Sequence, residues 1–92
     1  MDREEAKTIL RRLANQNCIG YGTHCREQMA ARKVKAQDFF QVLNWGEVIS
    51  VNPAKHGGLK CKVTGADTDG DDLTLVVILD EEHLHVTCVT VF

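Results

Sequence analysis

In the first half of the chain, apolar residues recur with the spacing of helices that bury one face. This pattern predicts three helices, over residues 3–16, 24–32 and 36–44. Asp2 and Thr23 precede the first two helices and are good capping residues, because their side-chain oxygens accept hydrogen bonds from the first helical turn. Gly46 follows the third helix and marks its end. The segment between the first two helices, which holds Gly20 and Gly22, is expected to be a connection.

After Gly46 the pattern changes to the alternation that is typical of strands. Four strands are expected, over residues 48–51, 59–64, 73–79 and 84–92. The pair Asp69-Gly70 predicts a tight turn between the second and third of them. Because short turns join the strands, neighbouring strands should be antiparallel. The predicted fold class is therefore α+β, with N-terminal helices packed on one face of a four-stranded, mainly antiparallel sheet.

The composition indicates a single globular domain over residues 1–92. The chain is 43% hydrophobic and 26% charged, without a linker or an internal repeat. It shows neither a secretory signal nor an apolar run of membrane-spanning length, so we expect a cytoplasmic protein with no membrane partner. In that reducing compartment the four cysteines, which lack Cys-x-x-Cys spacing, are expected to be buried thiols rather than disulfides.

The net charge of −2 conceals an uneven distribution of charged residues. Residues 1–62 contain all eleven Lys and Arg residues and six acidic ones, which gives +5. Residues 63–92 contain seven acidic residues and no basic ones, which gives −7. All seven of these acids lie in two expected turns, residues 67–72 and 80–82. If both turns lie away from the basic residues, the basic part of the chain is free to bind RNA.

Four segments form a series along the chain. They are Thr23-His24 followed by Met29, Arg32 and Val34; Leu43 to Ile49 with Gly46-Glu47; the Asp69-Gly70 turn; and the ending Val89 to Phe92. In order and spacing the series resembles a bacterial family called domain of unknown function 4258, over about residues 19–92. That family is similar to the RelE-, MqsR- and BrnT-like toxins, so the resemblance implies a RelE/barnase-like fold, RNA cleavage and a cognate antitoxin. The chain departs from the family pattern at Gln28, Lys33 and Phe92, where the family has Arg, Gly and Tyr.

Metal-independent RNA cleavage needs groups that transfer protons and cations that stabilise the phosphorane. Imidazole suits the first task because histidine changes charge near neutral pH, and a guanidinium suits the second because it binds two phosphate oxygens at once. His24 and Arg32, eight residues apart on one expected helix, are therefore candidate catalytic residues. Thr90, which matches the family ending, is the third candidate. The structural alternative is that His24 bonds a neighbouring backbone group and Arg32 is a solvated surface residue.

Lys60, Lys62 and Tyr21 are candidate substrate-binding residues. The two lysines alternate onto one face of a strand, where they would contact an RNA backbone or only protect an exposed edge. Tyr21 offers a ring on which a base can stack. His83 and His85 have a spacing that could chelate zinc, but no compact Cys/His motif accompanies them, and we expect no metal or other cofactor.

Two function hypotheses follow from these residues. The first is a metal-independent endoribonuclease of toxin–antitoxin type, with RNA as substrate and an antitoxin or other protein as partner. The alternative is a catalytically inactive protein-interaction module of the same fold, to which the altered family positions and the modest net charge point.

Overall fold

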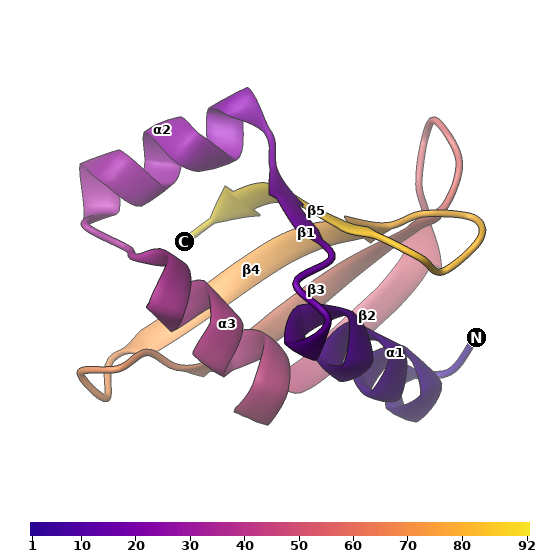
Figure 1. The fold of residues 1–92 in the computed structure, drawn as a ribbon, viewed down its shortest axis with the longest axis horizontal. Helices are drawn as coiled ribbons and strands as arrows, with labels where there is room; N and C mark the ends of the chain where they lie inside the picture. Colours follow the sequence, from indigo (N-terminus) through magenta and orange to yellow (C-terminus); the bar gives the residue numbers. More distant parts are fainter.

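The computed structural model describes all residues 1–92 as three helices and one five-stranded sheet (Figure 1). The helices are α1 (Arg3–Asn15), α2 (Thr23–Arg32) and α3 (Ala36–Trp45). The strands are β1 (Ile19–Tyr21), β2 (Glu47–Pro53), β3 (Leu59–Ala66), β4 (Asp72–Leu79) and β5 (Val86–Val91). The α+β class is confirmed, and the expected four-stranded, mainly antiparallel sheet is roughly right: a fifth, short strand, β1, occupies the segment expected to be a connection. None of the helices has the length and apolar character needed to cross a bilayer.

The sheet has the strand order β1-β5-β4-β3-β2. Strands β2 to β5 form the expected antiparallel meander. Strand β1 adds to the free edge of β5 in parallel, with Ile19 opposite Val86 and Tyr21 opposite Cys88. Figure 1 shows β1 running from the end of α1 to the start of α2. The sheet therefore contains both parallel and antiparallel pairs, and α2 begins directly after β1, beside β5.

Capping residues were predicted for the starts of α1 and α2 and for the end of α3, and two of these three predictions are confirmed. Asp2 caps α1 as predicted, since its Oδ1 accepts a hydrogen bond from the Glu5 nitrogen at 2.7 Å. The prediction that Thr23 caps α2 is wrong, because Thr23 is already helical and Gly22 precedes it without a side-chain bond. The Gly22 nitrogen donates to the Cys88 carbonyl oxygen at 3.0 Å, so β5 fixes the start of α2. Gly46 ends α3 as predicted.

The hydrophobic core lies between the helices and one face of the sheet. Its largest fully buried side chains include Phe39, Leu10, Leu13 and Leu43 from the helices and Leu75, Leu79, Val63, Val77, Val86 and Val91 from the strands. Strand residues alternate between the two faces, so those between the core positions point to the other side. We call that other side the open face, because the helices do not cover it.

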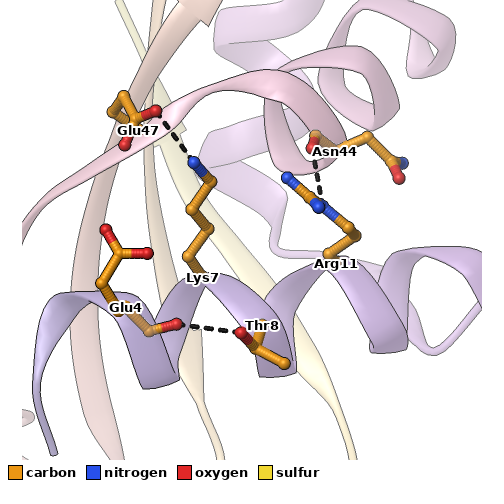
Figure 2. Close-up of polar contacts among 6 residues, drawn as sticks. All are labelled: Glu4, Lys7, Thr8, Arg11, Asn44 and Glu47. Carbon is orange, nitrogen blue, oxygen red and sulfur yellow. Dashed lines mark hydrogen bonds and ion pairs between the residues drawn. The ribbon is translucent and has the colours of Figure 1, made fainter.

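Polar contacts join α1 to β2 and to the end of α3 (Figure 2). Lys7 Nζ lies 2.8 Å from Glu47 Oε1, and Arg11 Nε donates to the Asn44 carbonyl oxygen at 2.9 Å. The Arg11 guanidinium also lies 5.7 Å from the centre of the Trp45 ring. Because the Glu47 side chain is 67% exposed, its ion pair adds little stability, and the buried face of α1 holds the helix in place.

The cysteines contradict the expectation of four free thiols. Cys25, in the first turn of α2, forms a disulfide with Cys88 of β5, and both residues are fully buried. Only the folded sheet brings these residues together, because they are 63 positions apart. Cys25 is the one fully buried residue of α2, so the bond is the main attachment of this helix. Cys61 is a buried thiol, and burial raises its pKa to about 11.

A buried carboxylate joins the start of α3 to the hairpin between β3 and β4. Asp38 Oδ2 accepts a hydrogen bond from the Lys35 nitrogen at 2.9 Å. Asp38 Oδ1 accepts from the Thr68 hydroxyl at 2.6 Å and from the Thr68 nitrogen at 3.0 Å. These bonds, the one from the Thr68 hydroxyl foremost, hold the pKa of Asp38 below its ordinary value. Asp38 therefore stabilises the fold in its charged form.

Asp38→Ala is expected to lower the free energy of unfolding at neutral pH by about 2–3 kcal/mol, because Lys35 and Thr68 lose an acceptor. The folded pKa lies below the unfolded value of ~3.9, so the contribution is complete above that value and is lost as the pH falls through the folded pKa. Urea denaturation of both proteins across this range measures the effect. Asp69→Ala, at an exposed position of the same hairpin, is the control, and equal losses in both variants would contradict the prediction.

Candidate nucleic-acid interface

Two rows of paired residues cross the middle of the open face. They are Ser50, Lys62, Val76 and Thr90, and Asn52, Lys60, Ile78 and Thr87. Each row runs perpendicular to the strands, so neighbours within it are about 5 Å apart. Lys60 and Lys62 share a face as their alternation predicts, and Thr90 lies two strands away from Lys62 in the same row. Neither row contains a carboxylate, so the centre of this face is basic.

Phe92 adds an aromatic ring to the open face. Its backbone pairs with Thr74 of β4, and Lys62 Nζ lies 5.1 Å from the centre of the ring. The ring is 47% exposed, which leaves room for a base to stack on it. Phenylalanine offers a stacking surface but has no hydroxyl to carry a proton.

His24 and Arg32 lie on α2, at its second and last residues. Both side chains are exposed, and neither takes part in a hydrogen bond or ion pair within the protein. The structural alternative for His24, a bond to a neighbouring backbone group, is therefore not observed. Helical geometry separates the two residues by about 12 Å along the axis and about 80° around it, so they do not stack on each other, and only extended side chains reach a common phosphate.

The predicted site residues do not form a single cluster. Lys60, Lys62 and Thr90 share the open face, whereas α2 belongs to the helix layer. Thr90 is the link between them, because it lies on β5, the strand against which α2 packs. A strand of RNA that follows the row from Lys62 to Thr90 would reach β5 on the face opposite α2 and would have to pass the edge of the sheet to meet His24.

Tyr21 faces the helices, because it lies opposite Cys88, which is a core residue. Its ring meets the edge of the Phe39 ring with 5.2 Å between centres, and burial raises the pKa of its hydroxyl. Tyr21 also lines a cleft of about 440 Å³ on this side of the molecule, together with Ile19, Phe40 and Trp45. Tyr21 and the two lysines thus lie on different faces, and one bound nucleotide cannot contact all three.

The two acidic turns lie at opposite ends of β4. Residues 67–72 form the β3–β4 turn, which Asp67 Oδ1 stabilises by accepting from the Asp69 and Asp71 nitrogens. This turn lies six residues along β3 from Lys60, or about 20 Å. Residues 80–82 lie instead beside the loop between β2 and β3, where a Cβ on Gly57 would be 2.4 Å from Glu81 Oε1. Folding therefore separates only the first acidic cluster from Lys60 and the β2–β3 loop.

His83 and His85 both precede β5, which begins at Val86 rather than at the expected residue 84. His83 adopts a left-handed backbone conformation with φ of 58°, and its own carbonyl oxygen accepts a hydrogen bond from Arg12 Nη2. Three or more His, Cys, Asp or Glu side chains do not come together anywhere in the structure in a way that could hold a metal ion.

Sequence reasoning missed two basic residues of the β2–β3 loop. Lys55 and His56 line a groove that also includes Lys60. The sequence shows them only as basic residues next to two glycines. They lie beside Lys60 of β3 because the loop turns back over the sheet, which the sequence does not predict.

Comparison with known proteins bears on residues 21–92, which match the family model described as domain of unknown function (DUF4258). Searches of curated proteins and of solved structures gave no significant match. The matched segment begins at β1 and contains α2, α3, every later strand and all the candidate site residues. The chain therefore belongs to the DUF4258 family.

Proposed function

We propose that the protein is a metal-independent endoribonuclease of toxin–antitoxin type that holds single-stranded RNA on its open face. The observation that carries the proposal is the composition of the two central rows, which present Lys60 and Lys62 among hydroxyl side chains without a carboxylate. Ammonium groups attract phosphates and hydroxyls donate hydrogen bonds to them, so this face matches an RNA backbone in charge and chemistry. An RNA substrate also implies action in the cytoplasm.

In the proposed reaction, a base removes the proton of a 2′-hydroxyl and the 2′-oxygen attacks the adjacent phosphorus. The bond to the 5′-oxygen breaks, and an acid protonates that oxygen. The products are a 2′,3′-cyclic phosphate and a 5′-hydroxyl end, and no cofactor is consumed. We assign proton transfer to His24, stabilisation of the phosphorane to Arg32, and binding of a neighbouring phosphate of the same RNA strand to Lys62. Thr90 supports this assignment, because its row leads from Lys62 to the strand on which α2 packs.

Purified protein is expected to cut mRNA or tRNA at internal sites in the presence of EDTA, with ribosomes added where naked RNA resists. His24→Ala should slow cleavage by about 100-fold or more, the usual contribution of a general acid or base. Lys62→Gln should weaken RNA binding and reduce its salt dependence by about one phosphate contact. Analysis of fragment ends and filter binding at several salt concentrations measure these effects.

His83→Asn is the matched control, since His83 is a half-buried histidine of the turn before β5 that belongs to neither central row, and asparagine tolerates its left-handed backbone. Equal cleavage by the native protein and by His24→Ala would reject the role of His24. Absence of both cleavage and RNA binding would reject the proposed function.

A second candidate function, binding of a partner protein without catalysis, is favoured by the cleft on the helix side. Trp45 and Phe40 line this cleft and are 77% and 41% exposed. Large exposed apolar side chains around a cleft are typical of protein-binding surfaces. Co-purification of a protein partner with the native chain but not with Trp45→Ser, in the absence of RNA, would support this function over the first.

A further inference from the structure

A groove of about 390 Å³ lies at one end of the open face, where the β2–β3 loop stands over β4 and β5. Lys55, His56 and Lys60 provide its polar lining. Ile78 and Val89 provide apolar surface. This volume falls within the ~300–1,000 Å³ range of small-molecule sites. The groove is therefore large enough for a ligand that combines a charged group with a ring.

The loop that forms one wall of the groove has a fixed shape. The Ala54 nitrogen donates to the Gly58 carbonyl oxygen at 2.9 Å, which closes the loop. Gly57 and Gly58 have positive φ values of 101° and 79°. A Cβ on Gly58 would be 2.3 Å from the Leu79 carbonyl oxygen, so only glycine allows the loop to approach β4 this closely. The groove thus exists before any ligand binds.

The apolar floor depends on an irregularity in β5. Pairing with β4 shifts between Val76 and Val77, which face Thr90 and Cys88, so Val89 has no partner in the register. Val89 is 36% exposed beside Ile78. An apolar surface in a basic groove contributes nothing to binding of a bare phosphate, but it can pack against a nucleobase.

Charge differs between the two sides of the loop. The groove itself is lined by no carboxylate. A neighbouring depression of about 360 Å³ shares His56, Gly57 and Ile78 with it and is lined by Asp80, Glu81 and Glu82. Asp80 Oδ1 accepts hydrogen bonds from the Leu84 and His85 nitrogens, which fixes this carboxylate beside the groove. A phosphate is therefore attracted to the lysine side and repelled from the other.

We propose that this groove binds one nucleotide of a single-stranded RNA, with the phosphate among Lys55, His56 and Lys60 and the base over Ile78 and Val89. The carboxylates of residues 80–82 line the neighbouring depression, which shares His56, Gly57 and Ile78 with the groove, so a base that extends over Ile78 can donate to them from an exocyclic amine. Adenine, cytosine and guanine carry such an amine and uracil does not. The inference rests on the proposed binding of RNA to the open face and adds to it a subsite with a preferred orientation and base.

Titration of the ¹⁵N-labelled full chain with adenosine 3′-monophosphate tests the subsite without requiring cleavage. We expect amide shifts at Lys55, His56, Lys60 and Val89. Lys60→Gln should weaken binding by about tenfold, the value of one charged hydrogen bond. Lys35→Gln, which removes the same charge from an exposed site at the start of α3, should change the Kd less than about twofold.

Three comparisons complete the test. Uridine 3′-monophosphate and inorganic phosphate should bind more weakly than the adenosine nucleotide, and hexa-adenylate RNA should bind more tightly because it also spans the central rows. Shifts confined to residues outside the groove, or equal affinity for all probes, would overturn the inference. Cleavage of RNA with no shifts at the groove would support the proposed function and reject the subsite. Nucleotide binding at the groove without cleavage would support the subsite and reject the ribonuclease activity.

Discussion

A variant in which Cys25 and Cys88 are both alanine is expected to unfold with a free energy about 4 kcal/mol below that of the native protein. The bond joins residues 63 positions apart. A cross-link of that span restricts the unfolded chain far more than the folded one, in which α2 already lies on β5. For a chain of this size, the loss corresponds to a fall of roughly 15–30 °C in the midpoint of thermal unfolding. Circular dichroism during heating and during urea titration measures both quantities.

Dithiothreitol should bring the native protein to the stability of the double variant and leave the double variant unchanged. Cys18→Ala, which removes a half-buried free thiol, controls for the loss of a cysteine as such. The unfolded native protein should contain two titratable thiols before reduction and four afterwards. Four thiols before reduction would contradict the bond.

The disulfide also bears on where the protein acts. Cytosolic thiols are kept reduced, and stable disulfides are typical of oxidising compartments. In a reducing cytoplasm the chain would have the stability of the double variant, and α2 would lose its main attachment to β5. Since α2 carries His24 and Arg32, the proposed activity should then be compared with and without reductant.

Phe39→Ala is expected to lower the free energy of unfolding by about 3–5 kcal/mol. Phe39 is fully buried between α3 and the sheet, and its ring contacts the Tyr21 ring. Removing it takes apolar surface out of the core and leaves a cavity that its neighbours can only partly fill. Urea denaturation, with the slope checked for two-state behaviour, gives the difference.

The next residue on the same helix provides the control. Phe40 is 41% exposed at the helix-side cleft, so Phe40→Ala should change the stability by less than about 1 kcal/mol. The two variants make the same chemical change one position apart, and only burial distinguishes them. Equal losses would show that α3 does not pack on the sheet as described.

The long elements could be predicted because each repeats its pattern several times. Strand β3 alternates over residues 59–64, which predicts both its existence and the face that carries Lys60 and Lys62, and β4 is marked by the apolar run of residues 73–79. Strand β1 has only three residues, one of them Gly20, and too short a segment shows no alternation. Its position depends on parallel pairing with β5, a contact between residues far apart in the chain. The sequence of residues 19–21 alone therefore does not predict that they pair with β5.

The same distinction applies to the candidate site: residues on long elements could be placed from the sequence, and residues whose position depends on long-range contacts could not. Periodicity was enough to place Lys62 on β3 and Thr90 on β5, and the family resemblance made Thr90 a candidate site residue. It could not show that Tyr21 faces the helices, because the side on which a residue of β1 points is set by its register with β5. Nor could it show that His56 lies beside Lys60, because two glycines with positive φ turn the loop back over the sheet.

The position of β5 has a consequence for biosynthesis. It follows the other four strands in the sequence, yet it lies between β1 and β4 in the sheet. Until residues 86–91 emerge from the ribosome, β1 has no partner, Cys25 lacks its native partner Cys88, and β4 presents an unpaired edge. The nascent chain up to that point is a three-stranded meander that lacks Thr90 and Phe92. Any activity that needs the complete open face therefore begins only after these residues are made, and a chain truncated before Val86 would expose a sheet edge prone to aggregation.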